Sequence, residues 1–169
     1  MSDESRSDAA AADPDDDFLY RGNRLGLPEN GPGSVPGVMR RLVGLALDWM
    51  LATLIVMGAI NLGLIGQELA LAADRGGEPE ALALTNFTTL SALVVFAAMN
   101  ILLLTLFGTS VGRRIAGVGL TATGERSWPW FVSMTVRTLL LCLVIPAVVY
   151  DRDTRGLHDR AAGTVSTSF

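Results

Sequence analysis

The chain has 169 residues, of which 50% are hydrophobic and 18% are charged, and its formal net charge is −4. This composition is too apolar for an ordinary soluble domain and is typical of a small integral membrane protein with one domain. A lone Cys142 excludes an intramolecular disulfide and a Cys-X-X-Cys metal site, and no nucleotide-binding motif, HExxH motif or nucleophile-base set is found. We therefore expect no enzyme, no cofactor, no metal and no nucleic-acid partner.

Residues 1–37 are predicted to form a disordered acidic N-terminal tail and a linker. Seven of the 17 acidic residues lie within the first 17 positions, among small and polar residues that cannot build a core. The tail is typical of a solvated segment, and a binding role is the alternative. Gly and Pro residues then interrupt any regular element between Phe18 and Pro36, which predicts an irregular approach to the membrane.

Arg40 and Arg41 precede an apolar segment, 42–66, that is long enough to cross a bilayer. We interpret the Arg pair as a cytoplasmic charge anchor. Asp48 lies inside the segment, where a carboxylate costs roughly 2.5 to 3.5 kcal/mol on insertion scales. We expect Asp48 to face the protein interior, to be protonated or to have a partner.

The second predicted span covers 87–107, which as a helix is about 31 Å long. An acidic polar loop, 67–86, separates it from the first span, and Arg113 and Arg114 follow it. Because Arg residues accumulate on the cytoplasmic side, the N-terminus and the loop at 108–127 are predicted to be cytoplasmic. The chain is thus expected to be a multi-pass membrane protein with a cytoplasmic N-terminus.

The third apolar segment, 128–150, has two interpretations. It contains Arg137 and is interrupted by Pro146, so it either spans the membrane or enters and returns on the same side. Charge bias favours the return, because the Arg residues of the C-terminal tail then stay in the cytoplasm. Segments 118–123 and 164–168 both resemble strands, and their pairing would also require one side.

Arg41 and Asp48 are seven residues apart, so they lie near one helix face, about 10.5 Å apart along the axis. One interpretation makes Asp48 a proton or cation site tuned by burial and a neighbouring guanidinium. The other makes it a fixed ion-pair partner, of Arg137 or of an Arg near the C-terminus, that sets helix packing. Asn100, inside the second span, is expected to hydrogen-bond across helices.

Two segments outside the spans carry candidate features. The loop at 108–117 combines Gly residues with Arg113 and Arg114, and such a loop either holds an anionic headgroup or phosphate or is simply a turn with charge anchors. The tail at 151–164 alternates acidic and basic residues beside the membrane. This pattern predicts a cap held by salt bridges.

Together these residues resemble the RDD family of small bacterial membrane proteins, named for one Arg and two Asp. The Arg that starts the first helix matches Arg41, the Asp within that helix matches Asp48, and the second Asp matches Asp159. The segment 155–164 carries the most specific match, and 108–114 matches the family's Gly-rich loop less closely. The resemblance covers roughly 38–166.

The resemblance implies a location in the bacterial inner membrane and transport of an unidentified ligand, including cation/proton exchange. The candidate charge network for ion or ligand binding, or for structure alone, is Arg41, Asp48, Arg137 and Asp159, supported by Asn100, Arg155, His158 and Arg160. In this hypothesis Asp48 binds a proton or cation, and the other charges tune it and close the cytoplasmic side.

The expected architecture is an all-α integral membrane protein with two transmembrane helices, a short third membrane-embedded or re-entrant segment and a small cytoplasmic β pairing. Residues 38–169 form the membrane domain. Two or three helices are too few to enclose a path, so transport would require a homo-oligomer or a membrane-protein partner in the lipid bilayer. The alternative function is an accessory or assembly subunit of a larger membrane complex.

Overall fold

The computed structural model describes residues 19–66, 80–123, 129–143 and 156–169. The acidic tail and the region of Pro146 lie outside these residues. In the linker, a short 3-10 helix, η1 (Asn23–Leu25), is followed by turns that lead to the first long helix.

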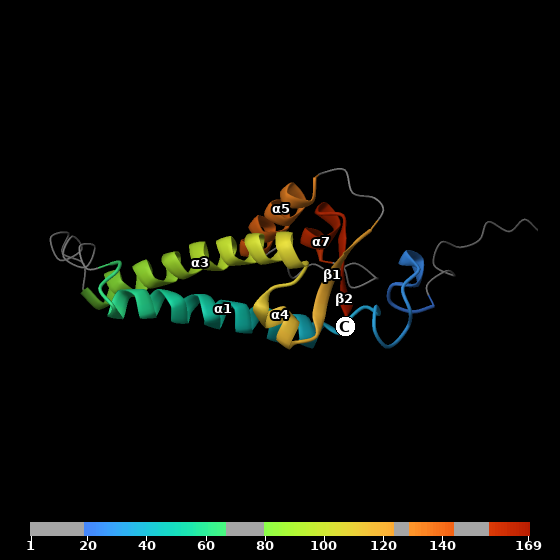
Figure 1. Cartoon of the computed structure of the whole chain (residues 1–169), viewed down its shortest axis with the longest axis horizontal. Coiled ribbons are helices and arrows are strands. Elements are labelled where there is room, and N and C mark those ends of the chain that lie inside the picture. Colours follow the sequence, from blue (N-terminus) through green and yellow to red (C-terminus); the bar gives the residue numbers. More distant parts are fainter. Residues whose placement is uncertain (1–18, 67–79, 124–128, 144–155) are drawn as a thin grey trace, which may run out of the picture.

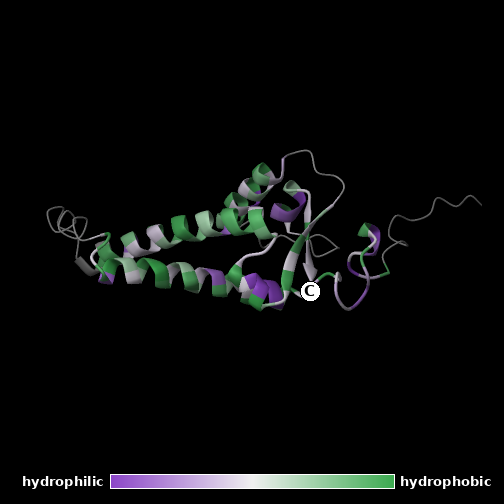
Figure 2. Cartoon of the chain, viewed as in Figure 1, coloured by the Kyte–Doolittle hydropathy of each residue, from purple (hydrophilic) through white to green (hydrophobic). Residues whose placement is uncertain are grey.

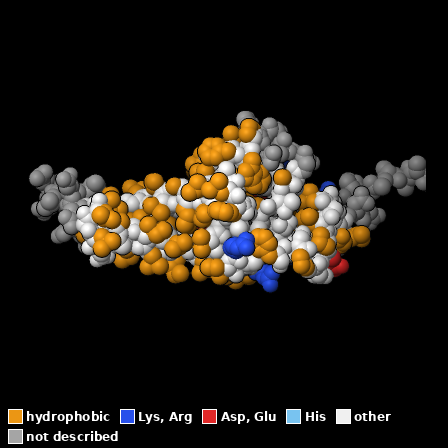
Figure 3. Space-filling view, viewed as in Figure 1, with side chains coloured by type: hydrophobic (Ala, Val, Ile, Leu, Met, Phe, Trp, Pro, Cys, Tyr) orange, Lys and Arg blue, Asp and Glu red, His pale blue; other side chains and the backbone are white. Residues whose placement is uncertain are grey.

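Two long helices, α1 (Val38–Asn61) and α3 (Glu80–Phe107), lie side by side and run in opposite directions (Figure 1). Both contain 24-residue stretches, about 36 Å as helix, that are apolar enough to cross a membrane. Large apolar side chains remain exposed along them, and hydrophobic atoms cover much of the face shown in Figure 3. Helices of this length with an apolar exterior are typical of membrane proteins rather than of soluble cores.

The first helix ends at Asn61 rather than at the predicted Gly66. Gly63 has a left-handed backbone with φ of 69°, and its N–H donates to the carbonyl of Ile60 at 2.9 Å. The N–H of Leu64 reaches back to the carbonyl of Ala59, also at 2.9 Å. This is the usual way in which a glycine terminates a helix.

The remaining elements gather at the end of the hairpin where α1 begins and α3 ends (Figure 1). They are α4 (Val111–Ile115), β1 (Val118–Ala122), α5 (Trp130–Cys142), α7 (Leu157–Ala161) and β2 (Thr164–Ser168). Figure 2 shows that α4 and α7 are largely hydrophilic, whereas α1, α3 and much of α5 are hydrophobic. The molecule therefore has an apolar hairpin with a polar cap at one end.

The predicted strand pairing is confirmed. Strands β1 and β2 are antiparallel, with Val118 opposite Ser168 and Ala122 opposite Thr164. The linker adds to the outer edge of β2, because the N–H of Gly33 donates to the carbonyl of Ser168 and the N–H of Ser168 donates to the carbonyl of Ser34, both at 2.8 Å. The start of α1, the end of α3 and the last strand are thus held together.

Helix α5 is shorter than the two long helices and packs against α3 and α7. The indole N–H of Trp130 donates to the carbonyl of Thr105 at 3.0 Å, which fixes the start of α5 to the last turn of α3. Ala52, Phe96 and Leu141, from three different helices, form a small buried apolar cluster. This packing joins α5 to the hairpin close to the polar cap.

Candidate functional site

Asp48 caps the short helix α4. It lies ten residues into α1, about 15 Å along the axis, and its side chain is fully buried. Its carboxylate accepts hydrogen bonds from the hydroxyl of Ser110 and from the N–H of Gly112, the latter at 2.7 Å. A carboxylate from another helix thereby satisfies N–H and O–H groups at the start of α4, the role that a capping side chain usually fills locally.

Two glycines permit this contact. A Cβ added to Gly112 would lie 2.7 Å from the backbone nitrogen of Asp48 and 2.8 Å from the Cβ of Leu47. A Cβ added to Gly44 would lie 3.0 Å from the Cα of Arg113. Because neither glycine has a side chain, the backbone of α4 rests directly on that of α1, within reach of Asp48.

Arg137 forms its ion pair with Asp159 rather than with Asp48. The Nε and Nη2 atoms of Arg137 are each 2.7 Å from Oδ1 of Asp159, and the two side chains are only 1% and 2% exposed. The Nε2 atom of His158 lies 3.6 Å from the same oxygen. Burial acts to raise the pKa of Asp159, but Arg137, His158 and Arg113 hold that pKa below its usual value. The carboxylate is therefore ionised, and the pair ties α5 to α7.

Arg113 lies between these two groups and is itself 5% exposed. Burial, and then the charge of Arg137, lower the pKa of Arg113 to about 9, while Asp159 and Asp48 oppose the shift. This pKa still leaves the guanidinium protonated at neutral pH. Its Nη1 atom is buried and has no hydrogen-bond partner among the described residues.

The burial of Arg113 was not predicted from the sequence, which left the loop at 108–117 as either an anion-binding loop or a turn with charge anchors. The next residue, Arg114, does behave as expected: it is exposed, and its guanidinium lies 5.6 Å from the ring centroid of Phe169. Adjacent residues in a helical turn point in different directions, so one of two neighbouring arginines had to face the protein once α4 packed on α1. Gly112, which precedes Arg113, was the feature of the sequence that could have indicated this close packing and the burial of Arg113.

We call the resulting group of charges the charged layer. Each of its members interacts electrostatically with Arg113, which is the central one. Its members are Arg41, Asp48, Arg113, Arg137 and Asp159. The structure thus brings together all four residues of the sequence-predicted network and adds a fifth.

The supporting residues have different positions. Asn100 is buried in α3, but its amide donates to the carbonyl of Phe96 in its own helix, at 3.1 Å, and not across helices. His158 is buried beside Asp159, and Arg160 is exposed. Arg155 lies outside the described residues. Within the part of the chain that the structure describes, no group of three or more His, Cys, Asp or Glu residues is arranged to hold a metal ion.

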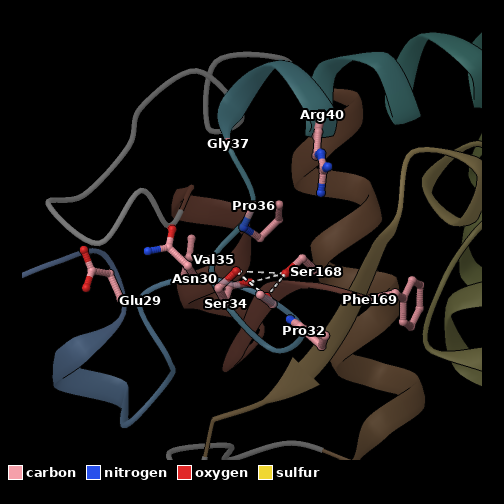
Figure 4. Close-up of a pocket in the computed structure, with 11 residues that line it drawn as sticks. Glu29, Asn30, Pro32, Ser34, Val35, Pro36, Gly37, Arg40, Ser168 and Phe169 are labelled. Atoms are coloured by element: carbon pink, nitrogen blue, oxygen red, sulfur yellow. Dashed lines mark hydrogen bonds between the residues drawn. The ribbon is translucent and has the colours of Figure 1, made fainter.

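A groove that sequence analysis did not identify lies between the linker and the last strand. Its volume is about 410 Å³, and its walls include Glu29, Arg40 and Phe169. At its floor, the hydroxyls of Ser34 and Ser168 are 2.9 Å apart, and both donate to the carbonyl of Gly31 (Figure 4). Figure 4 shows Arg40 pointing toward the groove from the start of α1. The polar groups at the floor are thus already paired with one another.

Two long apolar helices with a buried charged layer at one end indicate a small helical membrane protein. The chain belongs to the RDD family, whose family model matches residues 35–163. This confirms the resemblance carried by Arg41, Asp48 and Asp159. Neither a search of curated proteins nor one of solved structures finds a significant match.

Proposed function

We propose that this RDD protein is the protomer of an oligomeric membrane transporter for an ion or small charged ligand, with Asp48 as the site of a coupled proton or cation. The observation that carries the proposal is the charged layer at the end of two apolar helices. Each buried ion costs several kcal/mol even after relaxation. Ionisable residues retained at that cost in membrane proteins typically line ion pathways.

The hydrogen bonds of Asp48 give the proposal a mechanism. As a carboxylate, Asp48 accepts hydrogen bonds from Ser110 and Gly112 and holds the start of α4 against α1. Protonation removes the charge and weakens these charge-assisted bonds. Loading of Asp48 would then be linked to movement of α4, and with it of the neighbouring Arg113.

We further propose that the polar cap faces the cytoplasm of a bacterial cell. Exposed basic residues accumulate at this end of the molecule: Arg40, Arg114 and Arg160. This agrees with the positive-inside bias. The pairing of β1 with β2 also supports a chain that returns to the same side after α5, rather than a third span that would separate the two strands.

Oligomerisation follows from the size of the bundle. Two long helices and one short helix cannot surround a path by themselves, whereas several copies in a bilayer can. Large side chains exposed along α1 and α3, such as Leu54, Ile55, Leu90 and Val94, provide surface for lipid and for neighbouring copies. The charged layers of the copies would line or flank the shared path.

The second candidate function is an accessory or assembly subunit. It is favoured by the two hydrogen bonds that Asp48 makes within its own chain, which is the arrangement of a structural lock. Under this hypothesis the Arg137–Asp159 pair serves the same purpose. The exposed apolar faces of α1 and α3 would then pack against an unrelated membrane protein.

Native mass spectrometry of the protein, purified from its own membrane in mild detergent, would separate the two functions. A stable homo-oligomer is expected for the transporter, and a stoichiometric complex with another membrane protein for the accessory subunit. Flux of H⁺, Na⁺ and K⁺ is then measured in proteoliposomes for wild type, Asp48→Asn and the control Arg114→Gln. Loss of flux in Asp48→Asn alone is expected, since Arg114 is exposed and its replacement leaves Asp48 and its hydrogen bonds unchanged. Absent wild-type flux, or full flux in Asp48→Asn, would refute transport through Asp48.

A further inference from the structure

The side-chain carbonyl of Asn100 is a buried hydrogen-bond acceptor without a donor. Asn100 is fully buried in α3, and its Nδ2 atom donates to the carbonyl of Phe96 at 3.1 Å. Its Oδ1 atom has no hydrogen-bond partner among the described residues. Because only the nitrogen of an amide can donate to a carbonyl, the bond to Phe96 fixes which way the amide is turned. An unpaired buried group of this kind is rare in folded proteins and requires an explanation.

Asn100 lies at the same level of the helix hairpin as Asp48. Phe96 packs with Ala52 of α1 in the buried apolar cluster, and its ring contacts that of Trp49, with the centroids 5.7 Å apart. Because α1 and α3 run in opposite directions, Asp48 lies about one turn closer to the polar cap than Ala52. Asn100 likewise lies about one turn closer to the cap than Phe96. Both polar side chains are fully buried, so both lie in the interior of the bundle.

The unpaired donors of the charged layer do not bond to Oδ1 of Asn100. The Nη1 atoms of Arg113 and Arg137 are themselves without a partner among the described residues, so neither nitrogen reaches this acceptor. A donor that exists only in another protonation state would explain why the acceptor is free. Protonation of Asp48 creates such a donor, because a carboxylate can only accept hydrogen bonds whereas a carboxylic acid carries an O–H group.

We propose that Asn100 accepts a hydrogen bond from Asp48 when this carboxyl group is protonated, and thereby stabilises the proton-loaded state of the site. A proton from the solvent adds to Oδ2 of Asp48, which gives up the hydroxyl of Ser110 and donates to Oδ1 of Asn100. The other oxygen of the carboxyl group keeps the N–H of Gly112. The inference rests on the proton loading of Asp48 proposed above and adds the residue that receives the new O–H group.

The charges around Asp48 make such an acceptor necessary. These charges belong to Arg41 of α1, Arg113 of α4, Arg137 of α5 and Asp159 of α7, with His158 beside the last of them. The guanidinium groups favour the ionised form of Asp48, so the neutral form needs a compensating interaction. Helix α3 can provide one without adding a charge, because Asn100 is the only buried polar side chain among its described residues.

The proposal is tested on the full-length protein in detergent by infrared difference spectroscopy during a pH titration. The carboxylic acid C=O band of Asp48 is identified by its absence in Asp48→Asn. Asn100→Leu removes the acceptor and keeps a side chain of similar size. Asn61→Leu is the matched control, because Asn61 also donates to the carbonyl four residues earlier but is exposed on α1.

In wild type and in Asn61→Leu, Asp48 should become protonated at the same pH. In Asn100→Leu the midpoint should fall by about 0.5–1 pH unit, the shift expected when the protonated form loses one hydrogen bond. The C=O band should also change its frequency, because the O–H group has lost its acceptor. If Asn100→Leu does not fold, Asn100→Ala, which removes the same acceptor, takes its place.

An unchanged midpoint and band in Asn100→Leu would overturn the proposal. Equal shifts in Asn100→Leu and Asn61→Leu would overturn it as well, because they would show only a general change in helix packing. A wild-type Asp48 that stays ionised between about pH 4 and pH 9 would have no O–H group to donate and would also refute it. Ion flux is measured separately, so a titration that depends on Asn100 in a protein without flux would support the hydrogen bond and refute transport.

Discussion

The N–H of Gly112 donates a 2.7 Å hydrogen bond to Oδ1 of Asp48, 64 residues earlier in the chain. This bond joins the third turn of a long apolar helix to the first turn of a short polar one. The first of the two Asp residues that match the family therefore has a definite structural role in this chain. Any role in moving ions must operate through, or in addition to, that task.

Replacement of Asp48 by Ala should destabilise the protein more than replacement by Asn. Ala leaves the buried donors of Ser110 and Gly112 without an acceptor, at a cost of roughly 1–3 kcal/mol for each group left unsatisfied. Asn keeps an acceptor for Gly112 and offers its amide to the Ser110 hydroxyl. Thermal unfolding in detergent should rank the proteins wild type, Asp48→Asn, Asp48→Ala. Equal destabilisation by both variants would show that charge, and not hydrogen bonding, provides the stabilisation.

Gly112→Ala should displace α4 from α1. The new Cβ would lie 2.7 Å from the backbone nitrogen of Asp48, and a backbone atom cannot move aside as a flexible side chain can. We expect a loss of about 1–3 kcal/mol, typical of overpacking. Gly58→Ala is the control within α1, because its Cβ meets nothing within 4 Å and alanine favours the helix. Melting curves in detergent measure the stability of both variants. Similar melting temperatures for Gly112→Ala and Gly58→Ala would contradict the close packing of the α1 and α4 backbones.

The stability of the protein should fall in acid because of Asp159. Burial opposes ionisation of Asp159, but Arg137 and the other neighbouring cations lower its pKa below the usual 3.8. The folded chain therefore keeps this carboxylate ionised to a lower pH than the unfolded chain does. Its contribution is fully present above about pH 4 and is lost as the pH falls through the folded pKa.

Asp159→Asn provides the comparison for this pH dependence. It should cost roughly 3–5 kcal/mol at neutral pH, because Arg137 remains buried without its counter-charge. Its melting temperature should also vary less between about pH 5 and pH 2 than that of wild type. If the melting temperatures of the two proteins change equally with pH, residues other than Asp159 cause the acid sensitivity.

A disulfide engineered between β1 and β2 should form when the protein is oxidised in membrane vesicles. The hydroxyls of Thr121 and Thr167 are 3.0 Å apart, so cysteines at these two positions can meet. In a Cys142→Ala background, oxidation of the double-cysteine protein in membrane vesicles should give an intramolecular cross-link, detected as a shift in electrophoretic mobility. A pair of cysteines at Thr121 and Leu62, at opposite ends of the hairpin, should not react. Failure of the first pair would indicate that the strands lie on opposite sides.

The main features of the fold were predictable because they depend on local patterns. Apolar length alone indicated both long helices, and β-branched residues indicated the strands that pair. The end of α1 was placed too late, because the apolar run continues past the point where Gly63 turns the backbone. Hydrophobicity reports burial in lipid, whereas the helix end is decided by backbone geometry.

The partners within the charged layer were less predictable. Arg41, Asp48, Arg137 and Asp159 were all identified, but the sequence left open whether Asp48 is a proton or cation site or an ion-pair partner of Arg137 or of an Arg near the C-terminus, because that choice requires knowing where α5 lies. The actual partners of Asp48 are the hydroxyl of Ser110 and the backbone N–H of Gly112. The second of these is a group that any residue except proline carries, so the sequence contains no specific mark of it. Arg113 was missed because its burial depends on the close approach permitted by Gly44 and Gly112.

The order in which the chain is synthesised gives the last strand a particular importance. Both α1 and α3 leave the ribosome before Asp159 and β2, so the hairpin can enter the membrane while Arg137 still lacks its carboxylate and Ser34 still lacks the backbone partner that Ser168 supplies. The contacts that neutralise Arg137 and attach the linker to β2 can therefore form only after residues 159–168 have been synthesised.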